Sequence, residues 1–468
     1  MKESYFDFIT SQTDLKRHQL NYQNGALEYM GVSLMDLVKK YSSPLRIFVL
    51  PSIRKRINNA RTIFSDCMKQ VNYDSSYHYA YCLKSCHYHE VVKTALEEGS
   101  HLETSSAHEV AIIRELVKNK TIKPQIEIIH NGYKTEPYLT SIRDLIKESN
   151  NQVTVIIDSW HELENLEVLL VNSECSCNIG LRVTLSNNAS TANKSSRLGM
   201  DCTEILKHID KLSGSPSVTL KMIHFYVDQG IDDSPYYWEQ LSRVVDLYIQ
   251  LKREHENLDA INIGGGFPMC DHLNFDFDYQ DVVTKILMLI KKKCVTFEIA
   301  LPRIYSEFGK YTVGESGVLV YNVIDEKIRP ESESWYLLDN SVMNLMPDVW
   351  ASQKSYIVLP INQWHQPYKE VILGGLTCDS MDYYNSHIHG EPLLMPTLPT
   401  PINSLYIGFF YTGAYQDALS GVSGVKHCLL PSPNVLFIDR KANGELTEKL
   451  LSTNLGVQSI LSSLGYNQ

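Results

Sequence analysis

Short apolar runs alternate with longer amphipathic segments between about residues 45 and 310, and this alternation strongly constrains the fold. Valine, isoleucine, tyrosine and phenylalanine dominate the runs, as they do in β-strands. Strands that alternate with helices predict a parallel sheet, either doubly wound or closed into a (β/α)8 barrel. The number of runs favours the barrel. The expected strands cover residues 45–50, 77–83, 126–129, 153–157, 179–183, 220–227, 261–263 and 304–307.

The segments between these runs have helical spacing. Apolar side chains recur at Ile53, Ile57, Ala60 and Phe64, which predicts a helix over residues 53–70. The same pattern predicts helices over 107–118, 137–148 and 238–251, the last preceded by a Ser-Pro start signal at 234–235.

The pattern changes after about residue 312. Short apolar segments separated by proline, glycine and asparagine turns predict an all-β region. We therefore expect a barrel over 45–311 and a C-terminal β-sandwich-like domain over 312–468, which the N-terminal segment 1–44 joins. The expected β-strands cover residues 318–324, 335–338, 356–359, 370–373, 405–411 and 435–438.

The charge balance excludes some partners. The chain has 43 Lys and Arg against 54 Asp and Glu, a net charge of -11, which argues against nucleic acid and anionic membranes. A cationic small molecule is compatible with it. No run approaches the roughly 20 apolar residues of a spanning helix, and the first residues lack a signal core. The 10 cysteines have no zinc-finger spacing, so we expect reduced thiols, a cytoplasmic protein and no metal site.

Lys84 ends an apolar strand, and barrel active sites lie at the C-terminal ends of the strands. A lysine in a partly dry pocket can form a Schiff base, although a surface lysine would give the same pattern.

Gly264, Gly265 and Gly266 follow a later strand. Three glycines let backbone N–H groups approach a phosphate, although a plain tight turn explains them too.

An acid and a base follow the last expected barrel strand. Glu307 could keep a pyridine nitrogen protonated, and Lys310 could pair with a phosphate. Read alone, both could be solvated side chains.

In the β-region, Cys378 lies beside Asp379 and near Asp382, and negative charge raises a thiol's pKa. A thiol that stays protonated suits a proton donor better than a nucleophile, although a buried cysteine near a turn is equally compatible.

The order of Lys84, the triple glycine, Glu307, Cys378-Asp379 and Gly413-Ala414-Tyr415 resembles the pyridoxal-phosphate decarboxylases of the alanine-racemase-like fold. Ornithine, arginine and diaminopimelate decarboxylases belong to this group. The stretches SEFGKYTVGESG (306–317), LTCDS (376–380) and GFFYTGAYQDALSG (408–421) look most like a bacterial arginine decarboxylase branch. The resemblance covers about residues 45 to 440.

The resemblance implies roles for these residues around the cofactor pyridoxal 5'-phosphate. Lys84 would carry the cofactor, the three glycines and Tyr415 would contact its phosphate, and Glu307 would hold the pyridine nitrogen. Arg182 would lie near the ring. Cys378 would come from the partner subunit of a homodimer with shared active sites and reprotonate the α-carbon, while Asp379, with Asp382 nearby, would meet the distal cation of the substrate.

Three positions depart from the usual pattern of this group. Tyr226 stands where relatives have a stacking histidine, with His224 two residues earlier as a substitute, and Gln229 replaces a serine. Lys310 stands where relatives have arginine, which changes a bidentate phosphate contact into a point charge. The segment 196–199 also differs from the commoner form.

The expected activity is decarboxylation of a basic amino acid, foremost L-arginine to agmatine in polyamine biosynthesis. Ornithine, lysine and diaminopimelate decarboxylases, a racemase, and a catalytically inactive regulatory homologue are the alternatives. Cys-Asp at 378–379 weighs against diaminopimelate, because relatives acting on it usually have Cys-Glu there. Retention of Lys84 and Cys378 weighs against an inactive homologue.

Overall fold

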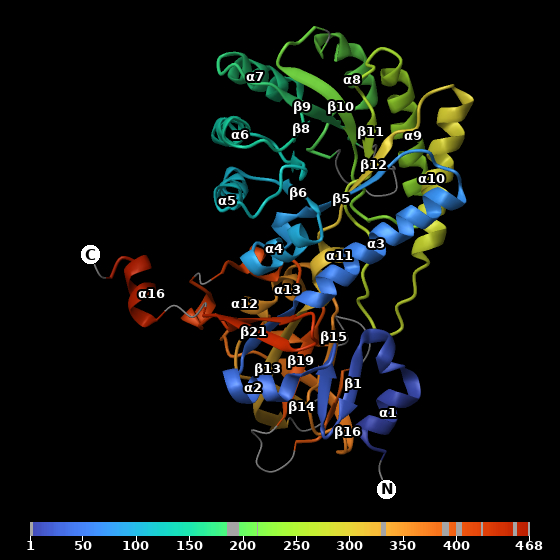
Figure 1. Cartoon of the computed structure of the whole chain (residues 1–468). Helices are drawn as coiled ribbons and strands as arrows, with labels where there is room; N and C mark the ends of the chain where they lie inside the picture. The colour runs from blue at the N-terminus through green and yellow to red at the C-terminus, as the bar shows by residue number, and fades with distance from the viewer. Residues whose placement is uncertain are drawn as a thin grey trace. The chain divides into compact units, whose positions relative to one another are not determined.

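The computed structural model describes residues 3–184, 196–212, 214–328, 334–385, 393–398, 405–422, 425–452 and 456–466. The chain forms two compact units (Figure 1). The barrel unit comprises residues 54–268 and 277–312, and the β-unit comprises residues 1–53, 269–276 and 313–468.

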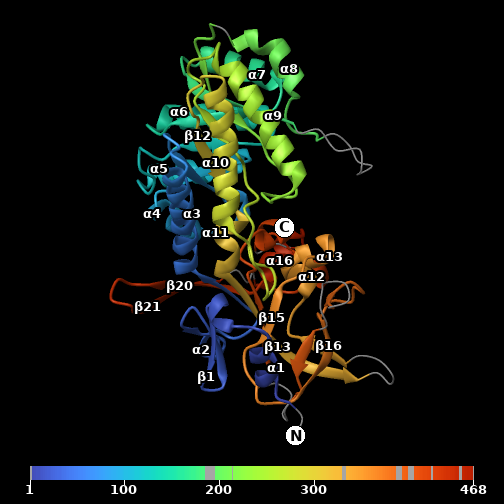
Figure 2. The same cartoon turned by 90° about the vertical axis from the view of Figure 1, so that its right-hand side faces the viewer.

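The barrel unit confirms the predicted (β/α)8 fold. Its strands close in the order β5 to β12, each parallel to its neighbours. Helices cover the outside of the strands (Figure 1), and α9 and α10 lie side by side there (Figure 2). The strands are β5 (Tyr77–Cys82), β6 (His101–Thr104), β7 (Ile128–His130), β8 (Val153–Ile157), β9 (Cys177–Arg182), β10 (Val218–His224), β11 (Ala260–Asn262) and β12 (Arg303–Glu307).

The barrel helices follow the amphipathic segments of the sequence. They are α3 (Leu50–Gln70), α4 (His89–Glu97), α5 (Ala107–Lys118), α6 (Glu136–Glu148), α7 (Trp160–Val171), α8 (Cys202–His208), α9 (Pro235–Lys252) and α10 (Tyr279–Thr296). Side-chain caps begin several of them: Ser106 Oγ accepts from the N–H of Glu109, and Ser159 Oγ accepts from the N–H of Glu162. Such caps satisfy N–H groups that the first helical turn leaves unpaired.

One expected barrel strand was wrong and one was missed. Residues Leu45–Val49 form β4, which pairs with β13 and β20 in the sheet of the β-unit. The missing barrel strand is β6, whose four residues include the buried polar Glu103 and Thr104. An apolar run shows that a strand is buried but not which sheet buries it, and polar side chains aimed at a barrel mouth hide a strand from hydropathy.

The β-unit contains a ten-stranded sheet and a smaller three-stranded sheet. The larger sheet runs β17-β16-β14-β13-β4-β20-β21, with β15, β18 and β19 paired beside it. All six expected strands of this region are present, as β13 (Gly317–Ile328), β14 (Ser334–Leu338), β15 (Ile357–Pro360), β16 (Tyr368–Gly374), β19 (Tyr406–Phe410) and β20 (Asn434–Arg440). The others are β17 (Tyr383–Tyr384), β18 (Leu394–Pro396) and β21 (Leu446–Leu451).

The N-terminal segment belongs to this second unit, as the sequence predicts. Its elements are α1 (Tyr5–Gln12), β1 (Leu20–Gln23), β2 (Ala26–Tyr29), β3 (Val32–Ser33) and α2 (Leu34–Tyr41). Leu27 and Tyr29 share an apolar core with Val318 and Trp364 of the C-terminal part. Among the described residues, no helix is both long and apolar enough to cross a membrane.

Candidate active site

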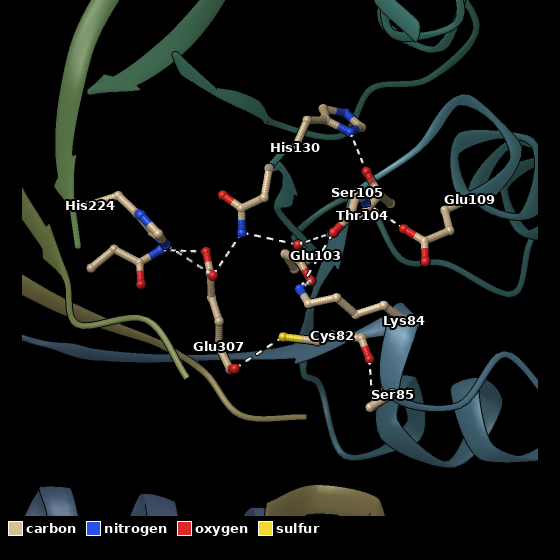
Figure 3. Close-up of polar contacts among 12 residues, drawn as sticks. Cys82, Lys84, Ser85, Glu103, Thr104, Ser105, Glu109, His130, His224 and Glu307 are labelled. Carbon is tan, nitrogen blue, oxygen red and sulfur yellow. Dashed lines mark hydrogen bonds and ion pairs between the residues drawn. The ribbon is translucent and has the colours of Figure 1, made fainter. Parts of the chain in front are cut away.

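Lys84 lies in a short 3-10 turn, Leu83–Ser85, at the C-terminal end of β5. Its Nζ is 2.5 Å from Glu103 Oε2 and 3.4 Å from Ser105 Oγ (Figure 3). The Lys84 side chain is 41% exposed, whereas that of Glu103 is fully buried. The amine is therefore held in place by a buried carboxylate, while the lysine side chain stays partly accessible from outside.

Asn131 connects the carboxylate of Glu103 to a second buried carboxylate. Its Nδ2 donates to Glu103 Oε1 at 3.0 Å and to Glu307 Oε2 at 2.7 Å. Ser105 Oγ also donates to Glu103 Oε1, at 2.8 Å. Glu103, Ser105, Asn131 and Glu307 lie near, at or just after the C-terminal ends of three barrel strands, so barrel closure brings them together at one mouth.

Glu307 ends β12 and is 4% exposed. Asn262 Nδ2 donates to its Oε1 at 2.7 Å, and His224 Nε2 lies 3.2 Å from its Oε2. Burial alone would raise the pKa of Glu307, but the nearby His224, Lys84 and Asn262 hold that pKa well below the ordinary glutamate value. Glu307 is therefore an anion at neutral pH.

The triple glycine forms a turn that admits no side chain. A Cβ would lie 2.6 Å from Phe225 O at Gly264, 2.8 Å from Glu307 O at Gly265 and 2.6 Å from Gly230 Cα at Gly266. The N–H of Gly264 donates to Asn262 Oδ1 at 2.9 Å. In the described part of the chain, the N–H groups of Gly265 and Gly266 have no such acceptor. These two N–H groups are therefore candidate donors to an anion.

The remaining predicted cofactor residues of the barrel unit lie after neighbouring strands. Arg182 ends β9 and is paired in register with His224 of β10. His224 is buried against Glu307, whereas Tyr226 is 37% exposed and packs over Gly264 and Gly265. Lys310 begins the short helix α11 (Lys310–Val313).

The other predicted residues lie in the β-unit, which is described by itself. Cys378 and Asp379 are exposed, and the Sγ of Cys378 is 3.7 Å from that of Cys428. The pKa of the Cys378 thiol is raised, chiefly by Cys428 and to a smaller extent by Asp379. Tyr415 has a left-handed φ of 68° and precedes α15 (Gln416–Ser420).

Asp382 is the predicted residue whose surroundings differ most from the expectation. It is 5% exposed, and its carboxylate accepts four hydrogen bonds. Oδ1 accepts from Ser341 Oγ and Met343 N, both at 2.9 Å, and Oδ2 accepts from Thr377 N at 3.0 Å and Thr377 Oγ1 at 2.7 Å. The carboxylate therefore stabilises the loop that contains Thr377 and Asp382.

The sequence reasoning missed Glu103, Ser105, Asn131 and Asn262. Each is polar and lies at or just after the C-terminal end of a barrel strand. The rule that singled out Lys84 applies equally to them. Recognising β6 as a strand would have been needed to apply it to Glu103 and Ser105.

Comparison with known proteins identifies the family. A family profile described as "Pyridoxal-dependent decarboxylase, pyridoxal binding domain" matches residues 51–314. The chain belongs to the pyridoxal-dependent decarboxylases. This membership makes it a pyridoxal-phosphate-dependent amino-acid decarboxylase and confirms the cofactor and the enzyme class that the sequence predicts.

Proteins described as arginine decarboxylases resemble this decarboxylase in sequence. It is 21% identical to a biosynthetic arginine decarboxylase of Prochlorococcus marinus (strain MIT 9215), over 93% of this chain and 85% of the relative. It is 22% identical to an arginine decarboxylase of Avena sativa, over 87% and 79%.

Solved structures of low identity show the same fold. The biosynthetic arginine decarboxylase of Campylobacter jejuni matches with a TM-score of 0.80 and 20% identity, over 99% of this chain and 91% of that chain. A diaminopimelate decarboxylase of M. jannaschii in complex with L-lysine matches with a TM-score of 0.77 and 18% identity, over 93% and 96%.

The residues at the barrel mouth fit pyridoxal phosphate chemically. They offer the primary amine of a lysine side chain that is 41% exposed, a carboxylate held as an anion, and two backbone N–H groups at a turn that admits no side chain. Two buried polar atoms beside Glu307, His224 Nδ1 and Asn131 Oδ1, have no hydrogen-bond partner among the described residues. Buried polar atoms are normally paired, so these atoms are compatible with a polar ligand.

Proposed function

We propose that this decarboxylase acts on a basic amino acid, with L-arginine as substrate and agmatine as product in polyamine biosynthesis. The observation that carries the reaction is the network of Lys84, Glu103, Asn131 and Glu307 at the barrel mouth. The names of its relatives support arginine.

The barrel residues would hold the cofactor, which when bound supplies an electron sink for the electron pair left by departing carbon dioxide. Lys84 would carry the cofactor, because it follows β5 at the barrel mouth and its side chain is 41% exposed. Glu307, which is held as an anion, would keep the pyridine nitrogen of the bound cofactor protonated. Glu103 and Asn131 position Lys84 and Glu307 through hydrogen bonds.

The phosphate and the ring would meet other residues. The N–H groups of Gly265 and Gly266 would donate to the phosphate, Gly264 would shape the turn, and Lys310 would pair with the phosphate as a point charge. Tyr226 is the better candidate for the ring-stacking residue, because His224 is already committed to Glu307. Arg182, in register with His224, would lie near the ring, as the resemblance implies.

Cys378 would supply the proton that the α-carbon receives after carbon dioxide leaves. Its raised pKa keeps the thiol protonated, as a proton donor requires. Asp379 would hold the distal cation of the substrate by a charge-assisted hydrogen bond. We assign these two residues to the partner subunit of a homodimer. Asp382 has no assigned substrate role, because its carboxylate binds its own loop.

The substrate assignment is tested with the purified, cofactor-loaded enzyme and a panel of L-arginine, L-ornithine, L-lysine and meso-diaminopimelate. Release of carbon dioxide and formation of the product amine are measured for each. The proposal predicts the highest kcat/KM for arginine, with agmatine as the product. A preference for diaminopimelate would replace it with the alternative that several structural neighbours represent.

A further inference from the structure

Two cysteine thiols and one histidine imidazole, groups that can bind a metal ion, lie close together on the surface of the β-unit. The Sγ of Cys378, the imidazole of His427 and the Sγ of Cys428 all lie within 4.8 Å of one another, and all three residues are exposed. The two sulfur atoms are 3.7 Å apart. Thiolate sulfur and imidazole nitrogen are the ligands that zinc prefers in proteins.

The sulfur–sulfur distance fits a tetrahedral metal. Two thiolates at about 2.3 Å from a tetrahedral zinc ion are separated by about 3.8 Å. A disulfide would instead require about 2.05 Å. The separation in this structure, 3.7 Å, therefore corresponds to one edge of a zinc tetrahedron.

Both ligand-bearing loops are fastened to the same short helix, α12 (Val342–Leu345). Asn344 Nδ2 donates to the carbonyl of His427 at 2.9 Å. On the other side, Met343 N donates to Asp382, whose carboxylate accepts from Thr377, the residue before Cys378. The cluster is thus held by hydrogen bonds on each side, as a preformed ligand set requires.

We propose that Cys378, His427 and Cys428 form a binding site for a single zinc ion. Binding displaces the proton of each thiol to solvent, so two protons are released for each ion bound and both sulfurs become thiolate ligands. Zinc-bound Cys378 has no proton to deliver, and zinc therefore inhibits decarboxylation reversibly. This inhibition rests on the proposed role of Cys378, whereas the metal site does not.

The sequence expectation of no metal site relied on spacing along the chain. Cys378 and Cys428 are 50 residues apart, so no short motif contains both. Folding of the β-unit brings the two cysteines together, so a rule based on local spacing does not test this cluster.

The test uses the full-length holoenzyme, kept reduced and freed of metal by a chelator that is then removed. Cobalt(II) is titrated as the probe, because thiolate ligation produces intense sulfur-to-metal absorption. We expect one cobalt ion per chain, displaced by zinc. Cys428→Ser and His427→Ala should each weaken binding by at least about tenfold, and Cys175→Ser, which changes a half-buried thiol elsewhere, should leave it unchanged.

Failure of the reduced wild-type protein to bind cobalt or zinc would overturn the site, and so would unchanged binding in the Cys428→Ser and His427→Ala variants. In a separate arm, zinc should inhibit wild-type decarboxylation, a chelator should restore it, and Cys428→Ser should be resistant. Because the cobalt titration needs no turnover, it distinguishes failure of the metal site from failure of the proposed activity.

Discussion

Lys84 Nζ lies 2.5 Å from Glu103 Oε2 at the mouth of the barrel. The carboxylate is fully buried and the lysine is half-exposed, so the pair fixes the direction of the amine without enclosing it. Asn131 extends the contact to Glu307, and this continuity makes the four residues one polar network.

Asn131 tests that network. Asn131→Asp replaces the amide that donates to Glu103 and Glu307 with a third acidic group. The loss of donor and the added repulsion should lower both cofactor content and kcat, at a stability cost of about 1–3 kcal/mol. Bound cofactor per chain, kcat and thermal unfolding are measured, with exposed Asn119→Asp as the control. Unchanged cofactor content and kcat would contradict the bridging role.

His78 and His101, at the N-terminal ends of β5 and β6, predict that the stability of the protein depends on pH. His101 Nδ1 accepts from the N–H of Glu127 at 2.9 Å, and His78 Nδ1 is 3.2 Å from His101 Nε2. Burial lowers the pKa of each to about 4, with further lowering by His101 at His78 and by Arg61 at His101. Both histidines are therefore neutral in the folded protein at neutral pH.

A folded-state pKa below the ordinary value of 6.5 means that the unfolded chain binds protons more readily. Stability is therefore lost as pH falls from about 6.5 towards 4. We expect the melting temperature to fall over this window, and to fall less steeply in His101→Gln. Parallel profiles for wild type and variant would show that His101 does not contribute to this dependence.

Two neighbouring aspartates should respond oppositely. Asp379→Ala removes an exposed carboxylate proposed to hold the substrate cation, so kcat/KM should fall roughly 30- to 5000-fold, from a loss of about 2–5 kcal/mol. The melting temperature should hardly change. Asp382→Ala removes a buried carboxylate with four hydrogen bonds and should lower the melting temperature. A change under threefold in kcat/KM for Asp379→Ala would exclude its substrate role.

Subunit complementation tests the shared site. If Lys84 and Cys378 act from different protomers, mixing inactive Lys84→Ala and Cys378→Ala proteins should restore activity. Random exchange makes half of the dimers hybrids with one intact site of two, so recovery should reach about a quarter of the wild-type value. Exchange demonstrated by mass spectrometry without recovery would show that each protomer uses its own residues.

Much of this architecture could be predicted from the sequence, because hydropathy patterns report burial directly. The helix over 107–118 and the six C-terminal strands follow from such patterns. The sheet to which a buried strand belongs depends on long-range pairing, which explains why β4 was assigned to the barrel. Hydropathy did not indicate β6, because its residues Glu103 and Thr104 are buried against polar partners rather than by apolar packing.

The positions of Lys84, the glycine turn and Glu307 at the ends of barrel strands were predictable, because each strand end carries its own signal in the sequence. The partners of Glu307 come from three other strands, and only barrel closure reveals that His224, Asn131 and Asn262 contact the same carboxylate. The sequence likewise does not show that the Asp382 carboxylate accepts hydrogen bonds from Ser341 and Thr377.

The most direct test of the central claim is to locate the cofactor on the chain. Borohydride reduction of the holoenzyme followed by peptide mapping should place the phosphopyridoxyl group on Lys84. Lys84→Ala should abolish attachment and activity, whereas Lys118→Ala, at an exposed position of α5, should change neither. A phosphopyridoxyl group on another lysine of the wild-type protein, or a Lys84→Ala enzyme that still decarboxylates arginine at the wild-type rate, would contradict the account.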